Sequence, residues 1–325
     1  MAVKLSEKDE IKVNEIVDIL KNKNSFLITS HINIDGDGIG SEIALFIGLK
    51  KLRKNVEIIN QDKLPKMFKF LPYSDKIKIF NEKIKEKNFD VGIIIDCGNI
   101  ERVGELKDFI LNLPFLINID HHLTNSNFGH INWSNPIFSS TGEMIYFICK
   151  KLGQINKKQA ICLYTSILYD TYCFTHHLSN FTFDIVKNLL TKGINPEKIA
   201  QRIFFEKSIK SVNLFKEALK TFKFYKKLSL CTMEISNKLL KKTRTQEEHT
   251  EGFVDFLISI KGVEVGILFK ERANGVKVSM RSKGKVDVEN IAKKFGGGGH
   301  REAAGCFFEN KSLKEVEKII LKELQ

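Results

Sequence analysis

Residues 26–38 read FLITSHINIDGDG, in which a short apolar run is followed at once by one histidine and two aspartates. A short apolar run that stops at polar and glycine residues is typical of a buried strand. Two further stretches have the same form, VGIIID at residues 91–96 and LINIDHH at residues 116–122. Because such runs alternate with helix-like segments, they predict a parallel α/β sheet whose strand ends meet at one edge.

The segments around these strands divide the chain. In the first half we expect helices at residues 7–22, 41–52, 141–152 and 158–169, and strands at 26–29, 56–59, 91–95 and 116–119. Residues 196–226 contain no glycine and have a helical pattern, which predicts a connecting helix. Beyond it we expect strands at 228–233, 263–269 and 276–280, and helices at 247–260, 288–295 and 312–324.

The expected architecture is therefore α/β with two domains. A parallel-sheet domain occupies residues 1–190, a helical linker residues 191–226, and a smaller α/β domain residues 227–325, with the active site expected in the cleft between the domains. The 325 residues suffice for two domains of ordinary size.

Composition excludes several classes of protein. No apolar run is long enough to span a membrane, and the charged start MAVKLSEKDE lacks the features of a signal peptide, so we expect a cytoplasmic location. None of the six cysteines forms a CxxC pair, which favours buried free thiols in a reducing compartment.

The net charge of +13 is distributed unevenly along the chain. Residues 1–185 have 23 basic and 22 acidic side chains, whereas residues 186–325 have 29 and 17, balances of +1 and +12. Any single lysine pair is typical of a solvated helix face, but the asymmetry between the halves indicates a polyanionic substrate for the second domain.

The first cluster of polar residues is His31, Asp35 and Asp37, which we expect on one tight loop. Gly36 and Gly38 would allow close backbone approach and unusual dihedral angles there. Two of the three ligands could face one metal while Asp37 faces a second. A lone histidine after a strand is usually structural, and aspartates are common in turns. These three residues therefore indicate a metal site only together with the other polar clusters at the strand ends.

Asp96 from the next strand could bridge two ions, and His121 and Asp170 could complete the coordination of the second metal. So many carboxylates and imidazoles at one place would repel one another unless cations lay between them. Mixed oxygen and imidazole ligation suits two Mn²⁺ ions, with Mg²⁺ or Co²⁺ as alternatives. Cys97, beside Asp96, is expected in the core.

Two metals about 3.5–4 Å apart would hold a hydroxide and neutralise a phosphoryl group. His122 would then contact the phosphate or donate a proton to the leaving group. Asp120 would not contact a metal itself but would orient an imidazole.

At these residues the sequence resembles a known family. HINIDGDGIGS, IIIDCGNIERVG, IDHH and the later Asp170 resemble the four motifs of the DHH phosphoesterase superfamily. SMRSKGKVDVENIAKKFGGGGHREAAG resembles the DHHA1 domain that accompanies it. The resemblance spans nearly the whole chain. It is closest to the stand-alone bacterial branch of nanoRNases, pAp phosphatases and cyclic di-AMP phosphodiesterases.

The resemblance implies roles for individual residues. His31, Asp35 and Asp96 would hold the first metal, and Asp37, Asp96, His121 and Asp170 the second. His122, with Asp96 among the catalytic groups, would face the scissile phosphate, and Arg102 in IERVG would bind phosphate. The far end of the nucleotide would be bound by Arg281, Ser282, Gly297, Gly298, Gly299, His300 and Arg301. The alternative for the glycine run is a plain flexible turn, although glycines also expose backbone N–H groups to anions.

The leading hypothesis is a Mn²⁺-dependent phosphodiesterase acting on cyclic di-AMP, pApA and other very short oligoribonucleotides, with pAp as a further substrate. We expect no need for long nucleic acid and no membrane, and leave a homodimer open. The alternatives are a single-strand exonuclease of the same superfamily, an inorganic pyrophosphatase, and a non-catalytic nucleic-acid-binding protein. The histidine-containing glycine motif argues against the pyrophosphatase, and a complete ligand set argues against a mere binder.

Overall fold

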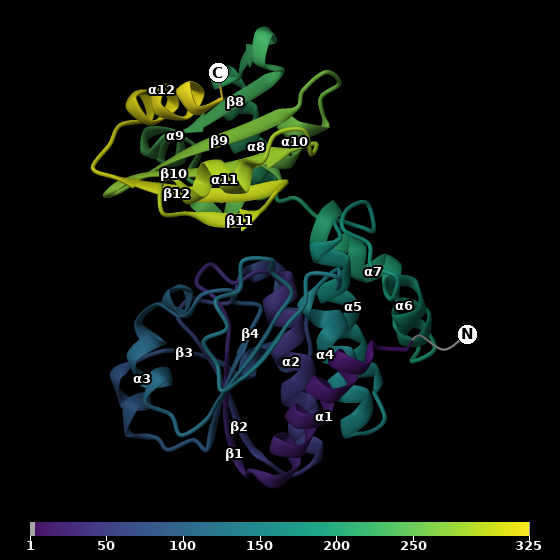
Figure 1. The fold of residues 1–325 in the computed structure, drawn as a ribbon. Helices are drawn as coiled ribbons and strands as arrows, with labels where there is room; N and C mark the ends of the chain where they lie inside the picture. The colour runs from purple at the N-terminus through teal and green to yellow at the C-terminus, as the bar shows by residue number, and fades with distance from the viewer. Residues whose placement is uncertain (1–3, 325) are drawn as a thin grey trace. The chain divides into compact units, whose positions relative to one another are not determined.

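The chain divides into two units between Glu206 and Lys207 (Figure 1). The computed structural model describes residues 4–324. Within that range, no helix has the length and apolar character that crossing a membrane requires.

The sheet of the first unit consists of six strands that pair in parallel throughout. Their order is β3-β2-β1-β4-β5-β6. The strands are β1 (Ser25–Thr29), β2 (Asn55–Asn60), β3 (Ile77–Ile79), β4 (Val91–Ile95), β5 (Leu116–Asp120) and β6 (Ile131–Ser134). The predicted parallel sheet is thus confirmed, and the short edge strands β3 and β6 are additions to it. Strand order reverses between β1 and β4, which creates the crevice where open α/β sheets place their ligands.

Helices cover both faces of this sheet (Figure 1). The main core lies under α1 (Glu7–Asn22), α2 (Gly36–Lys51), α4 (Thr141–Leu152) and α5 (Lys157–Asp170). A smaller core on the other face lies under α3 (Lys107–Leu111) and 3-10 turns that include η4 (Ile100–Leu106). The helices α6 (Thr182–Leu190) and α7 (Pro196–Ala200) complete the unit.

The helix α2 begins five residues earlier than the expected residue 41, and this corrects the picture of a loop. Asp35 is its N-cap, and its side chain accepts hydrogen bonds from the backbone N–H groups of Asp37 and Gly38. Asp37 therefore lies in the first helical turn. Gly36 and Gly38 do not adopt positive φ; they permit close packing instead, since a Cβ at Gly36 would lie 2.5 Å from the ring of Tyr169.

The expected continuous helix over residues 196–226 is wrong. Helix α7 runs into a π-helical turn at Gln201–Phe205, and the chain leaves helical geometry at Glu206. Ser208 then caps a new helix, α8 (Ile209–Ala218), by accepting a hydrogen bond from the Ser211 N–H. The sequence keeps its helical period across the break, but the capping residues end one helix and begin another.

The second unit is built on a mixed sheet of order β11-β12-β10-β9-β8-β7. Only β8 and β9 pair in parallel. Its strands are β7 (Lys223–Tyr225), β8 (Leu230–Ile235), β9 (Val265–Arg272), β10 (Gly275–Ser282), β11 (Gly298–His300) and β12 (Ala303–Glu309). Its helices beyond α8 are α9 (Asn237–Thr243), α10 (Phe253–Ser259), α11 (Val288–Lys293) and α12 (Leu313–Glu323). The single helix expected at 247–260 is divided by Gly252, whose φ of 82° ends the 3-10 turn η8 (Glu247–Thr250).

Candidate metal centre

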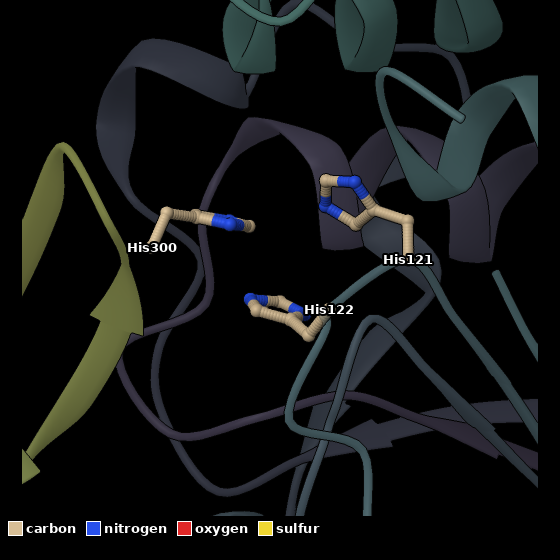
Figure 2. A group of neighbouring side chains, drawn as sticks. All are labelled: His121, His122 and His300. Carbon is tan, nitrogen blue, oxygen red and sulfur yellow. The ribbon is translucent and has the colours of Figure 1, made fainter. Parts of the chain in front are cut away.

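The candidate site lies at the carboxyl ends of three neighbouring strands. His31 lies two residues beyond β1, and Asp96 follows β4 directly. Asp120 is the last residue of β5, and His121 and His122 come next; their rings lie 5.0 Å apart between centroids (Figure 2). Because β1, β4 and β5 are adjacent at the reversal of strand order, the sheet brings these side chains together.

Asp96 occupies the middle of the cluster and has one oxygen toward each side. Its Oδ2 lies 3.5 Å from His31 Nε2, and its Oδ1 lies 3.7 Å from His121 Nε2. Its backbone adopts a φ of 55°, which is rare for an aspartate outside turns, and its N–H donates to Ile119 O at 2.9 Å. This geometry presents a single carboxylate to two groups of ligands at once.

Backbone carbonyl groups orient two of the imidazoles. His31 Nδ1 lies 2.8 Å from Ile32 O, and His121 Nδ1 lies 3.3 Å from Phe138 O. A carbonyl oxygen only accepts hydrogen bonds, so each Nδ1 carries a proton, and Nε2 is the ring atom that faces Asp96 and its neighbours and would be the one to bind a metal. Fixing the tautomer in this way is what metal-binding histidines require.

Asp37 is fully buried and is held by two helices. Its Oδ2 accepts the Thr141 N–H at 2.7 Å, and its Oδ1 accepts the Gly142 N–H at 3.0 Å and the hydroxyl of Ser166. Asp170, the last residue of α5, has its Oδ2 3.3 Å from His121 Nε2. Helices α2 and α5 therefore add two carboxylates to those of the sheet, and α4 supplies N–H groups that hold one of them.

In each of two sets of residues, the potential ligand atoms all lie within 4.8 Å of one another. One set is His31, Asp35 and Asp96, and the other is Asp37, Asp96 and His121. The sets share Asp96, and Asp170 adjoins the second through His121. Every metal ligand expected from the sequence is thus brought into one cluster.

The charges of this cluster favour cations. Burial, with the nearby Asp96 and Asp170 carboxylates, raises the pKa of Asp37 well above its usual range. Burial likewise raises the pKa of Asp170 to about 7, against the opposing effect of His121. Burial and mutual repulsion therefore penalise the charged forms of Asp37 and Asp170, whereas the adjacent imidazoles outweigh burial and lower the pKa of Asp96. Divalent cations between them would relieve the repulsion, so the residues present fit a pair of metals.

Cys97 is not part of this donor set. Burial raises the pKa of its thiol to about 12, and its Sγ donates to Asn99 O at 3.1 Å. The donors are therefore oxygen and imidazole nitrogen, which suits Mn²⁺ or Mg²⁺ better than a thiolate-seeking metal.

His122 has a different partner from the other two imidazoles. Its Nδ1 lies 2.6 Å from Asp120 Oδ1, and the other oxygen of Asp120 accepts from Asn125 Nδ2 at 2.6 Å. Burial would raise the pKa of Asp120, but the charge and hydrogen bond of His122 outweigh it and hold the pKa below its usual value. A carboxylate so placed orients the ring. The same atoms, with Asp96, also lie close enough to hold a metal.

Arg102 lies near the cluster, on η4. Its carbonyl accepts the Ile32 N–H at 2.6 Å. Burial alone would lower the pKa of His31, but its hydrogen bond to Asp96 outweighs burial and raises that pKa. The positive charge of Arg102 opposes this rise. The guanidinium is therefore within electrostatic reach of the cluster.

The structure also assigns positions to the expected nucleotide-binding residues of the second unit. Arg281 donates from Nε to Asp255 Oδ1 at 3.0 Å. Ser282 is its neighbour on β10, is buried, and donates to Glu264 Oε1 at 3.3 Å. Successive strand residues face opposite sides, so Arg281 and Ser282 do not share a surface.

The glycine run forms part of the sheet rather than a plain turn. Gly298 and His300 belong to β11, which pairs with β12, and Arg301 follows in the turn between them (Figure 2 shows His300). A Cβ at Gly297 would lie 2.2 Å from Gly305 O, and one at Gly299 2.3 Å from Ala303 O. The glycines are therefore needed for close approach to β12.

Sequence reasoning missed Thr141 and Ser166. Thr141 donates its hydroxyl to Asp96 Oδ1 at 3.2 Å in addition to its N–H bond to Asp37, and Ser166 donates to Asp37. The sequence SSTGE has the form of a helix start, and Ser140 is indeed the N-cap of α4. No signal in the sequence indicates that this helix start faces Asp37.

Comparison with known proteins agrees with this geometry. The profile described as "DHH family, N-terminal domain" matches residues 25–167, and that of the DHHA1 domain matches residues 230–325. The protein named bifunctional oligoribonuclease and PAP phosphatase NrnA from Thermus thermophilus is 30% identical over 97% of this chain and 94% of its own. The protein of the same name from Bacillus subtilis is 25% identical over 94% of this chain and 96% of its own.

Solved structures show the same fold. An exopolyphosphatase-related protein from Bacteroides fragilis superposes with a TM-score of 0.90 at 28% identity, covering 97% of this chain and 96% of its own. RecJ from Thermus thermophilus, solved with Mn²⁺, has a TM-score of 0.60 at 11% identity and is matched over 56% of its length. From the two matched domains and a full-length relative at 30% identity, we conclude that this chain belongs to the DHH family and carries a DHHA1 domain.

Proposed function

We propose that the protein is a metal-dependent phosphoesterase that hydrolyses very short oligoribonucleotides to 5′-mononucleotides and pAp to AMP. One observation carries the proposal: Asp96 presents one oxygen to His31 and the other to His121, between two ligand sets. The names of the Thermus and Bacillus relatives support the choice of substrates. Cyclic di-AMP and pApA belong to the same substrate class by their chemistry.

We propose that His31, Asp35 and Asp96 hold one Mn²⁺, and that Asp37, Asp96, His121 and Asp170 hold the other. When bound, such a pair activates water and neutralises charge on the phosphoryl group. Thr141 and Ser166 keep Asp37 and Asp96 in place through their hydrogen bonds. His31 and His121 keep their Nδ1 protons and donate them in hydrogen bonds to the carbonyl oxygens of Ile32 and Phe138.

His122 is the proposed proton donor to the leaving oxygen. Asp120 holds its Nδ1, which leaves Nε2 as the position from which a proton can be transferred. Arg102 would stabilise negative charge on the phosphate. In the second unit, Arg281, the glycines of β11, His300 and Arg301 would bind the remainder of the nucleotide; the buried Ser282 would only support that surface. The six unpaired cysteines of the described chain support a reducing compartment, and we place the enzyme in the cytoplasm.

A turnover panel with Mn²⁺ tests the proposal. The substrates are pAp, pApA, cyclic di-AMP, a five-nucleotide RNA and a long single strand. We expect the short substrates to have the higher kcat/KM, and Asp96→Asn to abolish hydrolysis of all of them. Asp184→Asn, at an exposed aspartate of α6, is the matched control and should retain activity. Undiminished hydrolysis by the Asp96 variant would refute the metal site; equal kcat/KM for the long strand would refute the substrate class.

A further inference from the structure

One face of the second unit's sheet is covered only in part. Helices α11 and α12 cover the face that presents Val276, Val278 and Met280 of β10. On the opposite face, α8 and α10 pack over β8 and the adjoining part of β9. The side chains of β10 and β12 on that face remain half-exposed, in strict alternation with buried ones. We call this the open face.

The open face presents a row of side chains along β10. Lys277, Ser279 and Arg281 alternate with buried neighbours and so point the same way. Four residues of extended strand separate Lys277 from Arg281, about 14 Å. Arg281, which is expected to bind the nucleotide, therefore has a second cation, Lys277, near the other end of the same strand.

Lys277 belongs to a cluster of cations at that far end. It lies directly across from Lys270 of β9, and Arg272 is two residues farther along on the same side. All three approach one carboxylate oxygen, Glu247 Oε1, at 4.0 Å from Lys277 Nζ, 3.0 Å from Lys270 Nζ and 2.6 Å from Arg272 Nη2. We call Lys270, Arg272 and Lys277 the β9–β10 cation cluster.

The cluster has more positive charge than this partner balances. Burial and the adjacent Lys270 and Arg272 lower the pKa of Lys277 to about 8, against the attraction of Glu247 and Glu251. The Nε of Arg272 is buried and donates to no acceptor among the described residues. A buried donor without an acceptor calls for a ligand or water, and the excess charge favours an anion.

An aromatic ring lies beside the cluster. Phe307 of β12 pairs with Lys277 of β10, so both project on the open face, and Phe307 is half-exposed. The tip of its ring extends toward Gly275, where a Cβ would lie 3.0 Å from Phe307 Cζ. Gly275 in turn pairs with Arg272 on β9. Cations beside an accessible ring face on a sheet are typical of surfaces that bind single-stranded nucleic acid, in which phosphates bind the cations and a base stacks on the ring; Phe307 is half-exposed.

We propose that the β9–β10 cation cluster and Phe307 form a second nucleotide subsite on the open face, which binds the phosphate and base of a residue that a mononucleotide substrate lacks. The inference rests on the proposed function for its substrate class. Such a subsite explains a preference for short chains. Arg281 holds one part of the substrate, and the β9–β10 cation cluster holds another part about 14 Å away along β10.

The test compares substrates of different length in one variant. Lys277→Gln removes the charge and leaves a polar side chain that is one atom shorter. We expect the ratio of the KM for a five-nucleotide RNA to the KM for pAp to rise about tenfold, as for the loss of one charge-assisted hydrogen bond. Phe307→Leu should raise the same ratio. Lys227→Gln, at an exposed lysine of the same unit, is the control and should leave the ratio unchanged.

A binding measurement separates this inference from the proposed function. Fluorescence anisotropy of an end-labelled five-nucleotide RNA is recorded in EDTA, so that no turnover is needed. Lys277→Gln should weaken binding about tenfold and make it less salt-dependent, by about one unit in the log–log slope. If the wild type hydrolyses nothing with Mn²⁺ but Lys277→Gln still weakens its RNA binding, the proposed function fails and the subsite stands. An unchanged ratio and unchanged binding in Lys277→Gln would overturn the subsite.

Discussion

The packing of α2 on α5 provides the sharpest test of how the fold supports the site. Both helices cross closely at Gly40, where a Cβ would lie 2.5 Å from the backbone oxygen of Cys162 and 2.9 Å from Ser166 Cβ. Gly48 lies two turns farther along α2, and a Cβ there would meet nothing closer than 3.4 Å, at the amide of Gln159. The two glycines therefore form a matched pair.

Alanine at each position changes the free energy of unfolding in opposite directions. Replacing a glycine inside a helix by alanine raises the free energy of unfolding by about 0.5–1 kcal/mol, and this holds at either position. At Gly40 the contact is with backbone that cannot move aside, and overpacking costs about 1–3 kcal/mol. We expect Gly40→Ala to be less stable by about 1–2 kcal/mol net, and Gly48→Ala to be more stable by about 0.5–1 kcal/mol.

Differential scanning calorimetry measures both variants in the presence of EDTA, so that metal binding does not contribute. For a unit of this size, the expected shifts are about 2–8 °C downward for Gly40→Ala and about 1–4 °C upward for Gly48→Ala. Because Ser166 donates to Asp37, Gly40→Ala should also reduce metal-dependent turnover, whereas Gly48→Ala should not. Equal shifts of the same sign in both variants would refute the packing argument.

Three further outcomes are expected. Asp120→Asn should lower kcat by about 10²–10⁴-fold because His122 loses its carboxylate, with Mn²⁺ affinity by calorimetry unchanged; a normal kcat would contradict the proton-donor role. Asp9→Ala should cost about 1–3 kcal/mol at pH 7 in urea unfolding, since Trp133 Nε1 loses its acceptor at 2.8 Å. Despite burial, hydrogen bonds from Ser6 and Trp133 lower the pKa of Asp9 in the folded state. The stabilisation that Asp9 provides is therefore fully present above its unfolded-state pKa of about 3.9, and it is lost as the pH falls through the lower folded-state pKa. A stability difference between Asp9→Ala and the wild type that persists undiminished at pH 2 would be inconsistent with this. EDTA should abolish turnover and lower Tm, Mn²⁺ should restore both, and Asp37→Asn should show a smaller response of Tm; a wild-type Tm indifferent to both additions would exclude metal binding to the native state.

The strands that carry the site were predictable because their signal is local. An apolar run that stops at His31, at Asp96 or at Asp120 indicates a buried strand and its end without reference to the rest of the chain. Boundaries set by capping were less accessible. Asp35 starts α2 five residues early, and Ser208 interrupts a helical period that looks continuous in sequence. In each case the boundary is set by a capping side chain that accepts backbone N–H hydrogen bonds, two at Asp35 and one at Ser208, and not by the periodic pattern.

The residue types that gather at the strand ends are visible in the amino-acid sequence, and they indicate that the chemistry involves cations and phosphate. The packing of the folded chain places one oxygen of Asp96 toward His31 and the other toward His121, and it brings Thr141 and Ser166 to support the cluster. It also decided that Ser282 is buried while Lys277 and Phe307 share a face. The reason is physical: a strand end is encoded within a few residues, whereas the partner of a buried carboxylate depends on how strands and helices distant in sequence pack together.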